Sequence, residues 1–186
     1  MAFTWSESSL AAYNTCTAPL QQVADRALEL GVVDIVFMEG LRGKAAQNDM
    51  HRLNKSKLLW PFGKHNVYQG NGGSDAPNIE TLARIANPTY PGGKMHVEPE
   101  AYRRLCNLIE EAPNGKACAM DIAPYFNDGR RIPWDDVFTW NKFGGFIVAV
   151  GVTLGVPLRW GGDWDGDWTN KDQGFHDLPH FELTGE

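Results

Sequence analysis

Residues 158–183 read LRWGGDWDGDWTNKDQGFHDLPHFEL, and this stretch decides the architecture. The segments Leu158–Trp160 and His180–Leu183 are predicted to be short strands, separated by an acidic loop. Pro179 excludes a regular helix at the second segment and favours an extended entry into a strand. Strands so short and so close along the chain do not fit a doubly wound parallel sheet, and they favour a small, mostly antiparallel one.

The stretches before this one supply helices and further strands. Thr17 is a good N-cap, apolar residues recur at helical spacing after it, and Gly31 ends the helix that they predict. The segments Val33–Met38 and Ala117–Tyr125 are predicted to be strands. Further helices are expected over residues 44–53, 100–111 and 134–154. We therefore predict an α+β fold in which helices flank a small, mostly antiparallel sheet.

Length and composition narrow the class of protein. A chain of 186 residues with 42% hydrophobic residues is the size of one globular domain with a real core. The net charge of −6 argues against nucleic-acid binding, which needs many cationic contacts. The longest apolar run, residues 146–156, is too short for a membrane span, so no membrane insertion is expected. The N-terminal MAFTWSESSL lacks the features of a secretory signal, which predicts synthesis in the cytoplasm.

Three residues in the second half of the chain carry candidate chemistry. Asp121 is the single carboxylate in the apolar stretch ACAMDIAPY, where burial is costly unless the charge is paired or coordinated. Asp177 and His180 stand three residues apart in DLPHFE, so one side chain can bind a metal while the other reaches the water on it. Taken alone, each residue also fits a structural role, such as an Asp at a strand end or a His packed at a strand edge.

A catalytic zinc site needs three protein ligands and one open position for water. His65, in SKLLWPFGKHN, is the candidate for the third ligand, and His96 in the following Gly-rich segment is its rival. With His65, Asp121 and His180 as ligands, a nearby carboxylate can take a proton from the water and return it to a leaving amine.

The acidic loop offers a second candidate cation site. Asp163, Asp165 and Asp167 alternate as in a calcium-binding loop, but the glycine is Gly166 and no glutamate stands at the twelfth position, so the loop is not an EF-hand. A solvated acidic loop is the first interpretation. A regulatory Ca²⁺ site at the three aspartates is the alternative.

Four blocks of the sequence, in this order, resemble the zinc peptidases that include D-alanyl-D-alanine carboxypeptidases and the L-alanyl-D-glutamate endopeptidases of phage endolysins. The blocks are residues 33–47 (VDIVFMEGLRGKAAQ), 55–66 (KSKLLWPFGKHN), 117–136 (ACAMDIAPYFNDGRRIPWDD) and 158–183. They span nearly the whole chain. The resemblance implies a hedgehog/DD-peptidase-like α+β fold, with residues 1–186 as a single zinc peptidase domain and a segment of about 67–114 inserted into it.

Matched position by position, the resemblance implies a metal centre and a catalytic base. One zinc ion per chain would be bound by His65, Asp121 and His180. Asp177 would be the general base that activates water and then the general acid that protonates the leaving amine.

The resemblance also implies substrate-binding residues and one departure from the family pattern. Arg42 would hold a substrate carboxylate or carbonyl, and Gln47 matches the glutamine that follows this arginine in the family. The family places the first histidine and the aspartate in one short motif, whereas here 56 positions separate His65 from Asp121. An insertion explains the separation, since loop-closure entropy grows slowly with length. In another register, His96 would be the ligand.

The resemblance implies a zinc metallopeptidase that hydrolyses amide bonds in peptidoglycan stem peptides, with the L-alanyl-D-glutamate endopeptidase activity of phage endolysins. Such an enzyme would be a monomer, made in the host cytoplasm without a signal peptide and acting on the cell wall. Two alternatives stay open: a D-alanyl-D-alanine carboxypeptidase, and a non-catalytic wall-binding module that keeps the fold without the metal.

Overall fold

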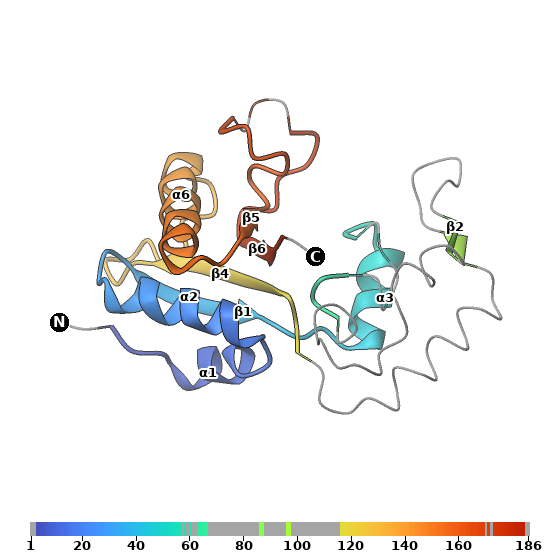
Figure 1. Cartoon of the computed structure of the whole chain (residues 1–186), viewed down its shortest axis with the longest axis horizontal. Coiled ribbons are helices and arrows are strands. Elements are labelled where there is room, and N and C mark those ends of the chain that lie inside the picture. Colours follow the sequence, from blue (N-terminus) through green and yellow to red (C-terminus); the bar gives the residue numbers. More distant parts are fainter. Residues whose placement is uncertain are drawn as a thin grey trace. The chain divides into compact units, whose positions relative to one another are not determined.

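The computed structural model describes residues 3–56, 58, 60, 63–66, 116–169, 171 and 173–184, and the backbone of residues 86–87 and 96–97 (Figure 1). The chain divides into two compact units, which we name the sheet unit, Met1–Gly40 with Cys118–Glu186, and the middle unit, Leu41–Ala117. Each unit is described by itself. Most of the predicted insertion, residues 67–114, and the whole of the predicted helix over residues 100–111 lie outside the described residues.

The sheet unit is built on a four-stranded antiparallel sheet with the strand order β1-β4-β6-β5 (Figure 1). Its strands are β1 Asp34–Glu39, β4 Ala119–Tyr125, β5 Leu158–Trp160 and β6 His180–Leu183. The two C-terminal strands begin and end at the residues that the sequence predicts, and the small antiparallel sheet is confirmed. β4 and β6 have a neighbour on each side, and most of their residues are buried.

Three described helices of the sheet unit cover the sheet: α1 Glu7–Tyr13, α2 Ala18–Glu29 and α6 Val137–Leu154. α1 packs on β1, α2 packs on α6, and α6 packs on β4 and β5. The largest fully buried side chains of this core are Trp140, Phe181, Leu20, Met120, Ile122 and Ile147. The predicted α+β class, with helices around one small sheet, is therefore confirmed.

The ends of α2 follow the sequence signals, with one difference. The helix begins directly after Thr17, and Gly31 lies just past its C-cap with a left-handed φ of 65°. The hydroxyl of Thr17 makes no capping hydrogen bond. Pro19 lacks an amide hydrogen, which removes one of the two donors that such a cap uses.

The starts of α6 and α1 differ from the prediction. α6 begins at Val137 instead of near residue 134, because the carboxylate of Asp136 accepts a hydrogen bond from the amide of Thr139 at 3.1 Å and caps the helix there. α1 was not predicted. It is only seven residues long, and its cap is Ser6, whose hydroxyl accepts from the amide of Ser9 at 3.2 Å.

α6 is long and apolar enough to cross a membrane by length and composition alone, a test that the core helix of a globular protein also passes. One side of it is packed closely on β5. A Cβ atom added at Gly144 would lie 2.5 Å from the indole ring of Trp160, whereas one at Gly145 would meet nothing within 4 Å. Only glycine at position 144 therefore allows the helix to lie this close to Trp160.

The middle unit contains α3 Lys44–Arg52, which confirms the helix predicted over residues 44–53. It also contains a short antiparallel pair, β2 Ala86–Asn87 and β3 His96–Val97. The side chain of His96 lies outside the described residues, so the choice between His65 and His96 stays a prediction.

Candidate metal centre

Asp121 and His180 face each other across the two central strands of the sheet. The antiparallel register of β4 and β6 pairs them directly. Side chains alternate along a strand, so the buried Met120 and Ile122 point to the opposite face from Asp121. Oδ1 of Asp121 lies 3.2 Å from Nδ1 of His180. The carboxylate predicted to be costly in an apolar strand is thus paired with the histidine predicted to be a ligand.

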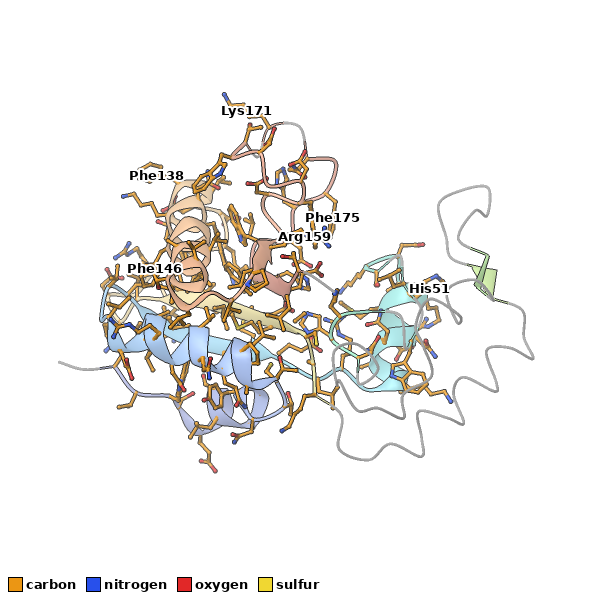
Figure 2. The ribbon with its side chains drawn as sticks, in the orientation of Figure 1. His51, Phe138, Phe146, Arg159, Lys171 and Phe175 are labelled. Atoms are coloured by element: carbon orange, nitrogen blue, oxygen red, sulfur yellow. The ribbon has the colours of Figure 1, made fainter. Side chains whose placement is uncertain are left out.

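The other ring nitrogen of His180 is also occupied. Nε2 lies 3.1 Å from Oε2 of Glu182, which stands two residues further along β6 and therefore on the same face. Arg159, labelled in Figure 2, is the cross-strand partner of Glu182 on β5. It donates to Oε1 of Glu182 from Nε at 3.0 Å and also from Nη2. Sequence analysis missed Glu182 and Arg159. The spacing of His180 and Glu182 on a predicted strand is the signal that could have found the first of them.

The charged groups around His180 and Glu182 shift the pKa values of these two residues. Burial lowers the pKa of His180, but hydrogen bonds to Asp121 and Glu182 outweigh it and raise that pKa to about 9. Burial raises the pKa of Glu182, but hydrogen bonds from His180 and Arg159 outweigh it and lower that pKa to about 2. At neutral pH and without metal, a protonated imidazole therefore lies between two carboxylates. A cation is favoured at this place, as expected of a metal site.

Asp177 is held close to His180 by the backbone of the turn between them. The amide of His180 donates to the carbonyl of Asp177 at 3.0 Å. Gly161 joins this turn, because its carbonyl accepts from Asp177 at 2.8 Å and its amide donates to His180 at 2.8 Å. The charge of Asp177 also raises the pKa of His180. Asp177, the predicted base, is thus close enough to His180, the predicted ligand, for their charges to interact.

The middle unit brings its own predicted residues together. Nη1 of Arg42 donates to Oε1 of the fully buried Gln47 at 3.1 Å, and the amide of Arg42 donates to the carbonyl of His65 at 2.7 Å. Gln47 in turn donates to Oγ of Ser56 at 3.0 Å and to the carbonyl of Leu58 at 2.6 Å. His65 is itself buried. Arg42, Gln47 and His65 therefore form one hydrogen-bonded group.

Asp121 and His180, the two predicted ligands in the sheet unit, place a carboxylate oxygen next to an imidazole nitrogen. A carboxylate and an imidazole are ligand types that zinc takes. His65 belongs to the middle unit, so its part as the third ligand stays a prediction.

Comparison with known proteins finds a family model that matches the C-terminal part of the chain. Residues 108–184 match the model described as phage L-alanyl-D-glutamate peptidase. This part of the chain is therefore similar to that family. The matched part contains Asp121, Asp177 and His180, whereas Arg42, Gln47 and His65 precede it.

A solved structure supports the fold of the chain. The crystal structure of the Serratia marcescens L-Ala D-Glu endopeptidase ChiX matches it with a TM-score of 0.57 and 17% sequence identity, covering 98% of this chain and 91% of that chain. At this identity the likeness establishes a shared fold. No curated protein matches the chain.

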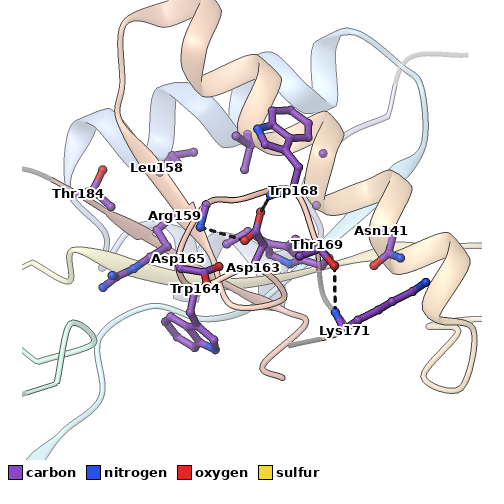
Figure 3. A pocket seen from close by; sticks show the side chains of 15 residues that line it. Asn141, Leu158, Arg159, Asp163, Trp164, Asp165, Trp168, Thr169, Lys171 and Thr184 are labelled. Atoms are coloured by element: carbon purple, nitrogen blue, oxygen red, sulfur yellow. Dashed lines mark hydrogen bonds between the residues drawn. The ribbon is translucent and has the colours of Figure 1, made fainter. Parts of the chain in front are cut away.

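The sheet unit also contains a cavity of about 660 Å³ between α6, β5 and the acidic loop (Figure 3). Arg159 and Trp164 line it. The guanidinium of Arg159 lies 5.6 Å from the ring of Trp164, and this ring lies 5.4 Å from the ring of His180. Two side chains that contact the candidate metal centre therefore also form a wall of the cavity.

The acidic loop holds Asp163, Asp165 and Asp167 close enough to share a cation. Each carboxylate also accepts a hydrogen bond from the loop itself. Asp163 accepts from the amides of Gly166 and Trp168, Asp165 from the side chain of Gln173, and Asp167 from the amide of Thr169. These bonds stabilise the loop without an ion, so both interpretations of the loop stay predictions.

Proposed function

We propose that the chain is a zinc-dependent endopeptidase that hydrolyses the L-alanyl-D-glutamate bond of peptidoglycan stem peptides, as part of a phage lysis system. The similarity of residues 108–184 to the phage L-alanyl-D-glutamate peptidases supports this reaction class. The observation that carries the proposal is the direct pairing of Asp121 with His180, next to Asp177, inside the part of the chain that matches the family.

His65, Asp121 and His180 would hold the zinc ion, one per chain. Three protein ligands leave one coordination place for water or substrate, as catalytic zinc sites require. When bound, zinc supplies a Lewis acid that polarises the scissile carbonyl and lowers the pKa of water.

Asp177 would take the proton from the attacking water and return it to the amine of D-glutamate as the amide bond breaks. Asp177 lies on the turn before His180, and backbone hydrogen bonds between these two residues and to Gly161 hold it beside the proposed ligand. Arg42 would bind a carboxylate or carbonyl of the stem peptide, and the buried amide of Gln47 would hold the guanidinium in place for this contact.

Digestion of purified peptidoglycan, followed by mass spectrometry, tests the proposal. The expected products carry a new D-glutamate amino terminus, and zinc analysis should give one ion per chain. Release of free D-alanine would identify a D-alanyl-D-alanine carboxypeptidase instead. A protein that binds peptidoglycan, holds no zinc and releases no fragment would be a wall-binding module, and the proposal would be wrong.

The proposal also covers where the enzyme works. We expect a monomer that is made in the host cytoplasm and reaches the peptidoglycan through a membrane lesion made by other phage proteins. The purified protein should then lyse bacteria only when their peptidoglycan is accessible, which a turbidity assay on intact and on permeabilised cells measures.

A further inference from the structure

We propose that Glu182 is a positioning residue of the metal centre, which directs Nδ1 of His180 toward the metal by holding Nε2, and that Arg159 keeps Glu182 in place. The inference rests on the proposed function only in taking His180 to be a metal ligand. It assigns a task to a buried carboxylate and an arginine that the proposed reaction does not itself use.

The geometry selects the ligand atom. Nδ1 is the ring nitrogen beside Asp121, at 3.2 Å, whereas Nε2 is 3.1 Å from Oε2 of Glu182. A neutral imidazole has one N–H donor and one lone pair. If Nε2–H donates to the Glu182 carboxylate, the lone pair is on Nδ1, on the side of the other ligand in the sheet unit. Glu182 thereby sets both the tautomer and the orientation of the ring.

The position of Glu182 is fixed by strand register. It follows His180 by two residues on β6, and it pairs with Arg159 on β5 and Ala119 on β4. A carboxylate with only 5% of its surface exposed would be costly without compensation. Two donors from Arg159 and one from His180 supply that compensation. The carboxylate therefore has no other described partner toward which it could turn in the sheet unit.

The ring of His180 is also held on its face. Trp164 lies next to it, with 5.4 Å between ring centroids, and the guanidinium of Arg159 lies over the ring of Trp164 at 5.6 Å from its centroid. Arg159 thus supports the histidine by two routes, through Glu182 and through Trp164. Metal-binding histidines whose second nitrogen loses its carboxylate partner typically bind metal 10–100-fold more weakly.

The test compares Zn²⁺ binding by the wild-type chain and by Glu182→Gln, using competition with a chromogenic chelator. We expect the variant to bind Zn²⁺ about 10–100-fold more weakly. The matched control is Glu29→Gln on α2, an exposed glutamate outside this network, which should bind Zn²⁺ as the wild type does. A second readout is the ¹⁵N chemical shift of the His180 ring in the Zn²⁺-loaded protein. It should show metal at Nδ1 and a proton at Nε2 in the wild type.

The outcomes separate this inference from the proposed function. Equal Zn²⁺ affinity of Glu182→Gln and wild type, or metal at Nε2, would overturn the inference even if the enzyme cleaves peptidoglycan. Weaker binding by the variant supports it even if no stem peptide is cleaved, in which case only the proposed function fails. If the wild type binds no Zn²⁺, both are wrong. Should Glu182→Gln not fold by circular dichroism, Arg159→Gln keeps the carboxylate, removes its anchor and is expected to weaken Zn²⁺ binding in the same direction.

Discussion

Substitution of Gly161 by alanine tests whether the WGGDW motif, residues 160–164, is required to hold Asp177 close to His180. A Cβ atom at this position would overlap the carbonyl oxygen of Asp177, and it would lie 3.1 Å from the Cβ atoms of both Asp177 and His180. The overlapping atom belongs to the backbone, so no flexible side chain can move aside. The turn must shift away from Gly161.

The size of the effect follows from what that shift breaks. Gly161 makes two backbone hydrogen bonds to this turn, each 2.8 Å long, one with Asp177 and one with His180. Overpacking typically costs about 1–3 kcal/mol, and each lost hydrogen bond costs about 1 kcal/mol. We therefore expect Gly161→Ala to lower the free energy of unfolding by about 3–5 kcal/mol. Displacement of catalytic groups by about 1 Å should lower kcat about 100-fold.

Urea unfolding gives the stability of Gly161→Ala, and release of soluble peptidoglycan fragments gives its turnover at a temperature at which it stays folded. Gly174→Ala is the matched control, because it lies on the same loop and a Cβ there would meet nothing within 4 Å. The control should change stability by less than about 0.5 kcal/mol. Wild-type stability and turnover in Gly161→Ala would refute the reasoning, since the turn could then not be packed against this glycine.

Three further substitutions or conditions address the other parts of the site. Asp177→Asn should lower turnover by about 10²–10⁴-fold while Zn²⁺ binding stays within a few-fold of wild type, because the base is lost and the three ligands are kept. Gln47→Met, which keeps the side-chain volume, should lower kcat/KM about tenfold, because Arg42 loses the amide that holds it. Without metal, the protein should lose up to roughly 3 kcal/mol of stability from pH 6.5 to 9, because the pKa of His180 is raised to about 9 and its ion pairs are lost as it deprotonates. In the acid range, the stabilisation from Glu182, whose pKa is lowered to about 2, is present above pH 4.5 and is lost as the pH falls toward 2.

For each of these three predictions, one result would contradict the assigned role. Zinc analysis and lysis assays on Asp177→Asn would contradict the assigned role if full turnover remained. Asp49→Asn, an exposed residue of the same helix α3, is the control for Gln47→Met, and an equal kcat/KM in both variants would exclude the anchoring of Arg42. Urea unfolding of chelator-treated protein at pH 6 and pH 9 measures the third effect. A stability that is flat or rises over this range would show that His180 is not paired with carboxylates.

The sequence predicted the strands of the sheet unit well, because their signals are local. Ala117–Tyr125 is apolar except for Asp121 and Tyr125, and His180 follows a proline that sets the start of β6. The register that pairs Asp121 with His180 is a property of the folded sheet, and no single segment encodes it. The resemblance to the family placed both residues at one metal ion, but it did not give this register.

The parts that were missed depend on contacts between distant residues. Arg159 and Glu182 are 23 positions apart, and they appear in the sequence as an ordinary surface arginine and a strand glutamate. Their partnership requires the β5–β6 register as well as the orientation of His180 between Asp121 and Glu182. α1 was missed for a different reason, because seven residues are too few for an amphipathic pattern to emerge.

The two glycines of WGGDW show why a short motif can be specific for this site without containing a catalytic group. A Cβ at Gly161 would overlap the turn that carries Asp177, whereas one at Gly162 would overlap the indole of Trp160. Trp160 in turn donates from its indole nitrogen to the carbonyl of Leu178 at 2.7 Å, inside the same turn. The backbone of one glycine and the ring that the other accommodates therefore hold the Asp177–His180 segment from two directions. A residue larger than glycine at either position must displace this segment, so the motif constrains the distance between Asp177 and His180 through packing and hydrogen bonds together.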